Sequence, residues 1–168
     1  MPFTPYHFGP GAAVKAVMPR HFSFTMFCFA QIVTDFETAY YFLCGEYPLH
    51  RWLHTYLGAS VLAVCCVLVG RPICQAALRV WGRWPNAPFK RYFHITDHIS
   101  LGSAVTAAFI GTYSHVFLDS IMHADVEPFE PFSTRNPFYQ IISLFALHAL
   151  CIGLGAFGTW YLASRSTK

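Results

Sequence analysis

Histidine and acidic side chains recur in this chain as three groups with short spacings. Two of the groups repeat a spacing of four, and residues four apart on a helix lie about 40° apart around its axis, on one stripe. Imidazole and carboxylate are the ligands that zinc, manganese and iron prefer. The groups are Asp35 with Glu37, His50 with His54, and His115 with Asp119 and His123.

Several of these side chains fall inside apolar stretches, where ionisable groups are expensive and therefore candidates for function. A single histidine at a membrane interface is usually an amphipathic hydrogen-bonding residue. Packing alone does not explain seven histidine and aspartate side chains in one membrane protein, because unpaired charges in lipid are costly. We expect a divalent metal site that suits two or three ions better than one, with zinc favoured and manganese or iron as alternatives. The predicted ligands are His7, Asp35, His50, His54, His115, Asp119 and His123.

The composition indicates that lipid is the solvent. Hydrophobic residues make up 55% and charged residues 11% of the 168 residues, and the mean hydropathy is +0.40. A typical soluble domain carries about 25% charged residues, so this chain has too few to coat a globule. Its apolar residues also form long blocks. The sequence predicts an all-α fold, an integral membrane helical bundle formed by one domain over residues 1–168.

The apolar blocks predict four spans, each near the ~20 residues that cross a bilayer core. They cover residues 22–43, 53–70, 99–121 and 139–163. Nine of the eleven basic residues fall on one side of these spans. The positive-inside rule then places the C-terminus and a basic loop, residues 71–98, in the cytoplasm, and most of the predicted ligands in the outer half. We expect a bacterial-type inner (plasma) membrane.

The basic loop, residues 71–98, also indicates which partners the protein binds. Basic residues could contact nucleic acid, but charges spread among tryptophans are typical of an interfacial loop on anionic headgroups. We therefore predict membrane lipid and a small-molecule or lipid substrate as partners, with no nucleic acid. A homo-oligomer stays open.

The N-terminal segment is too short to cross a membrane. We expect residues 7–18 and 21–35 to form two short antiparallel helices, each roughly 17 to 21 Å long. Such a re-entrant or interfacial hairpin is tolerated where it packs against protein, and it would place His7 at the depth of Asp35.

A further cluster, His94, Asp97 and His98, precedes the third span. Roughly 25 Å of helix separates it from His115, so the two clusters cannot share one ion. We favour a structural or interfacial role for it, and a second ion or a proton path is the alternative.

Several motifs along the chain form a recognisable set. They are His7-Phe8-Gly9, Asp35-Phe36-Glu37, His50-Arg51-Trp52-Leu53-His54-Thr55, the set Gly111, Ser114, His115 and Asp119, and the stretch Pro128 to Pro131. Together they resemble the YdjM-like family of predicted inner-membrane metal-dependent hydrolases. Two departures stand out: Glu37 occupies a position where the family has aspartate, and His54 and Thr55 are in inverted order. The resemblance implies a hydrolase without naming its substrate.

The leading hypothesis is a membrane-embedded metal-dependent hydrolase that acts on a lipid or other amphiphilic phosphoester. Coordination lowers the pKa of a water toward ~7, and Glu37 or Asp125 would accept or deliver the proton. The guanidinium of Arg51 suits a phosphate or carboxylate of the substrate. The alternative is a metal-binding membrane protein without catalysis: a transporter, a sensor or a scaffold.

Overall fold

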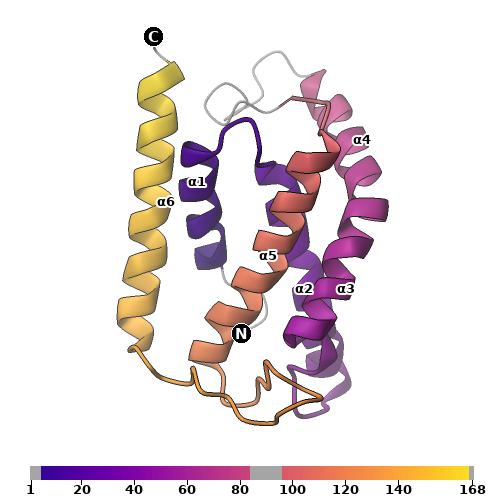
Figure 1. Ribbon diagram of the computed structural model, residues 1–168, viewed down its shortest axis with the longest axis vertical. Helices are drawn as coiled ribbons and strands as arrows, with labels where there is room; N and C mark the ends of the chain where they lie inside the picture. The colour runs from indigo at the N-terminus through magenta and orange to yellow at the C-terminus, as the bar shows by residue number, and fades with distance from the viewer. Residues whose placement is uncertain (1–4, 84–95, 167–168) are drawn as a thin grey trace.

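Long α-helices make up most of the chain (Figure 1). The computed structural model describes residues 5–83 and 96–166, and these contain no strand, which confirms the predicted all-α fold. The elements are η1 (Pro5–His7), α1 (Phe8–Val17), α2 (Phe24–Cys44), η2 (Trp52–His54), α3 (Tyr56–Cys65), η3 (Cys66–Gly70), α4 (Arg71–Gly82), α5 (Leu101–Met122) and α6 (Leu144–Ser166).

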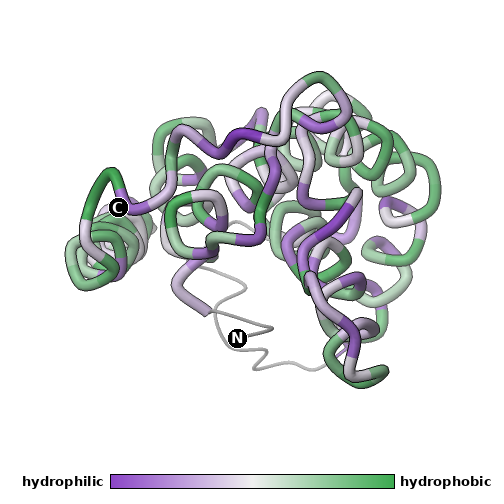
Figure 2. Tube along the Cα trace, turned by 90° about the horizontal axis from the view of Figure 1, so that it is seen from below, coloured by the Kyte–Doolittle hydropathy of each residue, from purple (hydrophilic) through white to green (hydrophobic). Residues whose placement is uncertain are grey.

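Three helical segments are long and apolar enough to cross a membrane: Tyr56–Gly82, Leu101–Met122 and Leu144–Arg165. Only 17% of the most apolar part of the last segment is buried inside the protein, so this helix turns most of its surface outward. Viewed from below, hydrophobic residues cover the outer flanks of the helices (Figure 2). The chain is therefore a helical membrane bundle. The first predicted span, residues 22–43, corresponds to α2, whose 21 residues include Gln31, Asp35 and Glu37, and its crossing of a membrane stays a prediction.

The helix bounds differ from the predicted spans at two places. The prediction of a loop from residue 71 is wrong for residues 71–82, because α3, η3 and α4 form one continuous helical segment. The π-helical turn η3 lies directly before Pro72, and such turns accommodate a residue that has no N–H to donate. At the other place, α6 begins at Leu144 rather than at residue 139. Residues 84–95 of the predicted basic loop lie outside the described residues.

Polar caps fix where the long helices begin. The side chain of Ser23 accepts a hydrogen bond from the N–H of Met26 at the start of α2, and Ser100 caps α5 in the same way. These caps satisfy N–H groups that have no partner within the helix. Both capped ends lie at the upper end of the bundle in Figure 1, and α2 and α5 run downward from there side by side.

The short helix α1 returns into the bundle and packs along α6 (Figure 1). It runs antiparallel to α2, as the sequence predicts for the N-terminal hairpin. Contact between α1 and α6 is close because Gly158 presents no side chain there: a Cβ on Gly158 would collide with the backbone of Ala12. Small residues at such crossings let two helix backbones approach each other in membranes. The hairpin therefore packs against protein, as a re-entrant segment requires.

A second close approach joins α2 to α5. A Cβ on Gly111 would lie 2.9 Å from the Cβ of Ala30 and 3.2 Å from the carbonyl oxygen of Phe27. These distances are too short for a real side chain, so glycine sets how near the two helices lie. One turn further along, the same crossing brings the polar faces of α2 and α5 together.

The α1–α6 contact can be tested with a single methyl group. Gly158→Ala should destabilise the protein by about 1–3 kcal/mol, because the crossing has no room for the added atom. Gly153→Ala makes the same change in α6 where no atom lies within 4 Å of the added carbon. That control should be neutral or stabilised by up to about 1 kcal/mol. Thermal unfolding in detergent measures both, and equal melting temperatures would contradict the packing described here.

Candidate metal centre

Asp119 lies at the centre of a buried polar cluster, with 3% of its surface exposed. Its Oδ2 atom is 3.2 Å from Nε2 of His115, 3.4 Å from Nε2 of His54 and 3.8 Å from Nε2 of His50. Its Oδ1 atom lies 3.4 Å from Nε2 of His7. One carboxylate thus faces four imidazoles that come from η1, the segment before α3, and α5.

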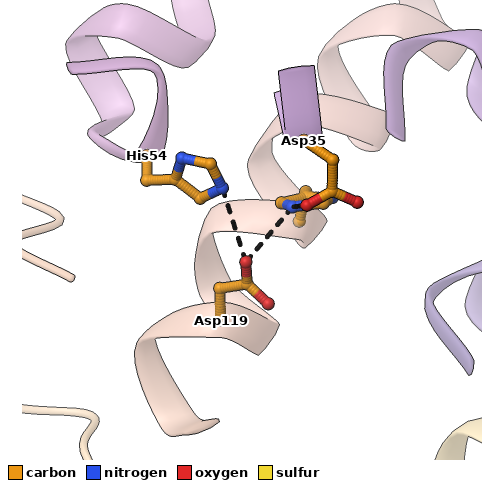
Figure 3. Close-up of side chains that lie close together, drawn as sticks. Asp35, His54 and Asp119 are labelled. Atoms are coloured by element: carbon orange, nitrogen blue, oxygen red, sulfur yellow. Dashed lines mark ion pairs between the residues drawn. The ribbon is translucent and has the colours of Figure 1, made fainter. Parts of the chain in front are cut away.

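Asp35 completes the inner group from α2. Its Oδ1 atom is 3.4 Å from Nε2 of His115, and Asp35, His54, His115 and Asp119 each offer one ligand atom within 4.8 Å of the others. Figure 3 shows Asp35 and His54 approaching Asp119 from different parts of the bundle. Ligand atoms about 2.0–2.1 Å from a tetrahedral zinc lie roughly 3.3 Å from one another. The separations of 3.2 and 3.4 Å match that spacing.

Hydrogen bonding alone does not account for these short distances. Among the described residues, Nε2 of His115 and both ring nitrogens of His7 are buried without a hydrogen-bond partner. A buried nitrogen left in this way is costly and calls for a missing partner. Two buried carboxylates, Asp35 and Asp119, also carry two negative charges that a divalent cation would balance. The residues present therefore fit a metal ion.

Gln31 fixes which nitrogen of His115 faces the group. The Nε2 of Gln31 donates to the carbonyl oxygen of Gly111 at 3.2 Å, and this acceptor settles the orientation of the amide. Oε1 of Gln31 therefore points to His115 and accepts a hydrogen bond from its Nδ1 at 2.7 Å. With Nδ1 donating to Gln31, the neutral form of the ring directs the lone pair of Nε2 toward Asp35 and Asp119.

Glu37 fixes which nitrogen of His54 faces the buried group. Its carboxylate accepts hydrogen bonds from the backbone N–H groups of Arg51 and Leu53, and Nδ1 of His54 lies 3.2 Å from its Oε2. Since a carboxylate only accepts, Nδ1 of His54 donates and Nε2 is left facing Asp119. His54 belongs to the short helix η2, and α3 begins only after the cap residue Thr55. The direction of the His54 ring is therefore not set by the register of α3, and the inverted order of His54 and Thr55 does not turn the ring away from Asp119.

A second group adjoins the first: His50, His123 and Asp125 each offer a ligand atom within 4.8 Å of the others. Nδ1 of His50 donates to Oδ1 of Asp125 at 3.0 Å, which turns Nε2 toward Asp119. The rings of His50 and His123 stack with their centroids 4.4 Å apart. His123 follows the last residue of α5 in extended backbone, so it leaves the stripe predicted for a continuous helix. His50 links the two groups.

The loop residues of the second group have perturbed acidity. Burial lowers the pKa of His50 to about 4, so its ring is neutral at pH 7 and can coordinate an ion. Burial favours the neutral acid at Asp125, but the adjacent His50 ring and two backbone N–H groups hold the pKa of Asp125 below its ordinary value. The pair therefore offers a lone pair and a negative charge at neutral pH.

A pocket of about 620 Å³ reaches the second group from outside the bundle. Arg51 lines it but is already engaged: its guanidinium lies 3.0 Å from Glu46 and 3.6 Å from the ring centre of Tyr41. The pocket gives a solute access to three of the predicted site residues, His50, Arg51 and Asp125. It is lined by Tyr47, Pro48, His50, Arg51, Asp125, Glu127 and Glu130.

The structure brings the seven predicted ligands into the two groups or into contact with them; their coordination of an ion stays a prediction. Gln31 was missed, although a lone amide four residues before Asp35 in an apolar stretch was an available signal. Of the other predicted cluster, His94 lies outside the described residues, and His98 lines a pocket at the opposite end of the bundle.

The fold and the site together define a helical membrane protein with a buried candidate metal centre. Residues 1–164 match the family described as Domain of unknown function (DUF4184), and the chain belongs to that family. No curated protein and no solved structure matches the chain.

The orienting role of Gln31 is open to a direct test. Gln31→Met keeps the length of the side chain but removes the acceptor for His115, so metal affinity should fall about 10–100-fold. Gln31→Glu keeps an acceptor oxygen and should lose less. Competition with a chelator on the purified protein measures both affinities. An unchanged affinity in Gln31→Met would show that His115 needs no such support.

Proposed function

We propose that this protein is a membrane-embedded metal-dependent hydrolase, with zinc as the favoured ion. The observation that carries the proposal is the convergence of Asp35, His54, His115 and Asp119 within 4.8 Å. Three of the histidines also have their second nitrogen held by a separate acceptor, which is the arrangement that supports metal ligands in proteins. Hydrolysis is favoured by the resemblance of the motifs to the YdjM-like hydrolases.

The ion would supply Lewis acidity, which lowers the pKa of a coordinated water toward ~7. The protein's own residues divide the remaining work. Glu37 already accepts several hydrogen bonds from N–H groups and holds His54, so we assign it a positioning role rather than proton transfer. Asp125 is hydrogen-bonded in a similar way, to His50 and to two backbone N–H groups, but unlike Glu37 it lines the open pocket, so it is the better placed of the two to accept a proton from a reacting solute.

The substrate that we favour is a lipid or other amphiphilic phosphoester. The ligands from α5, His115 and Asp119, belong to its last two turns, so the centre lies near the end of a helix long enough to cross a membrane. The residues that line the pocket belong to the α2–η2 and α5–α6 connections, and these connections lie at that same end of the bundle (Figure 1). A headgroup at the membrane surface could reach such a pocket while its acyl chains remain in lipid.

A non-catalytic metal-binding role is the second candidate, and one observation favours it. Asp125, Glu127 and Glu130 make the pocket rich in carboxylates, which would attract a free cation toward His50. A transporter, sensor or scaffold could use the same ligands to hold or pass an ion.

Purified protein separates these functions. We expect bound divalent metal and turnover of at least one phosphoester or ester in a panel of soluble and amphiphilic substrates. Asp119→Asn should lower both metal content and turnover by at least about 100-fold, because it removes the charge that four histidines share. His21→Gln changes an exposed histidine and serves as the control.

Two outcomes would reject the hydrolase. Equal metal content in Asp119→Asn and His21→Gln would show that the cluster around Asp119 does not bind the metal. Stoichiometric metal without turnover on any substrate, together with ion flux into liposomes, would establish the transporter instead.

Arg51 tests whether the substrate is an anion. Arg51→Gln should raise KM about tenfold or more while metal content stays unchanged, because a charge-assisted hydrogen bond of about 1.5–3 kcal/mol is lost. Arg135→Gln removes an exposed basic side chain from the same side of the predicted spans and should leave KM unchanged. Equal KM values in both variants would leave Arg51 as a partner of Glu46 and Tyr41 alone.

A further inference from the structure

A separate pocket of about 570 Å³ lies at the end of the bundle remote from the metal centre. It forms where the α1–α2 connection, the start of α5 and the last turns of α6 meet, at the upper end in Figure 1. Its volume falls in the range of pockets that enclose small ligands, about 300–1,000 Å³. No residue of the metal centre lines it.

The charges in this pocket are all of one sign. Lys15, Arg20 and Arg165 line it, and none of the described lining residues is acidic. The ammonium of Lys15 is the least exposed of the three, since only 6% of that residue's surface is accessible. It donates to the backbone oxygens of Pro19 and Phe22 at 2.6 and 3.0 Å, which leaves one of its three hydrogens for another acceptor.

Backbone groups add to this positive environment. The N-terminus of α2, at Ser23 to Thr25, and that of α5, at Ser100 to Ser103, both line the pocket. The first N–H groups of a helix have no partner within it; Ser23 and Ser100 each cap one of them here, and the helix dipole favours negative charge at that end. These two helices have 21 and 22 residues, so each contributes a full dipole. Buried ammonium, guanidinium groups and two helix ends together favour an anion.

Apolar side chains also line the pocket. They are those of Phe22, Phe24, Leu78 and Ile99, beside the charged groups. A ligand that carries both an anionic group and apolar chains would contact both kinds of lining residue favourably, whereas a small hydrated anion would suit only the charged ones. The neighbouring helix α6 is largely exposed and apolar, so acyl chains can lie against its outer surface.

We propose that this pocket binds the phosphate of an anionic phospholipid headgroup. Basic pockets between membrane helices recognise lipid headgroups in this way, through charge and hydrogen bonds to the phosphate oxygens. The bound lipid would contact α1, α5 and α6 together. Among the described residues that line the pocket, three are cationic and none is a carboxylate, so nothing there repels the phosphate. Because the metal centre lies at the other end, this lipid is a bound structural partner rather than the substrate.

Native mass spectrometry of the full-length protein in detergent tests the proposal. Phosphatidylglycerol should bind with defined stoichiometry and more tightly than phosphatidylcholine. The double variant Arg20→Gln, Arg165→Gln should weaken phosphatidylglycerol binding about fivefold for each charge removed. The matched control is Arg79→Gln, Arg83→Gln, which removes two exposed basic residues of the neighbouring segment that do not line the pocket. Lys15 is left in place because its backbone contacts hold the α1–α2 connection.

Each outcome either supports or overturns binding of an anionic phospholipid in this pocket. Weaker binding in the pocket variant but not in the control supports the proposal. Equal weakening in both would mean diffuse attraction to the basic face, and equal binding of both lipids would mean no headgroup selection; either overturns it. Competition by millimolar inorganic phosphate with no preference for lipid would identify a free-anion site instead. None of these results depends on whether the protein hydrolyses a substrate.

Discussion

Two buried carboxylates surrounded by imidazoles are the constraint on which the rest of this structure depends. Asp35 and Asp119 belong to helices packed in an apolar bundle, and charge in such surroundings must be balanced locally. The surrounding structure is arranged for coordination: Gln31, Glu37 and Asp125 occupy the far nitrogens of three histidines and leave the near nitrogens directed inward. A dication meets both requirements, for charge and for electron pairs.

Helix packing explains why residues distant in sequence meet at this point. Gly111 lets α5 approach α2, and the same face of α5 carries His115 and Asp119 one and two turns later. Contacts between the helices thus place the ligands, and no single helix contains the site. The enzymatic proposal therefore depends on tertiary packing in lipid, which in membranes relies on small residues and polar contacts rather than on hydrophobic collapse.

Much of this arrangement could be predicted from the sequence because apolar blocks and intramembrane charges are strong signals. The all-α membrane fold, the short hairpin and the residues that gather around Asp119 follow from them. What could not be predicted depends on local backbone. The helix passes Pro72 through a π-helical turn, His54 lies in a short turn before α3, and His123 leaves α5 in extended backbone. Residue periodicity carries no information about such departures. Gln31 was missed because the candidates were chosen as ionisable residues in apolar stretches, and an amide is not ionisable.

The close packing of α1 on α6 has a consequence for biogenesis. His7 belongs to the first element of the chain, yet the main packing partner of the helix that follows it, α1, is the last helix. A nascent chain inserted through α5 already holds Asp35, His54, His115 and Asp119, but α1 then has only its smaller contact with α2. The described packing of the first and last helices is therefore completed only when α6 joins the bundle.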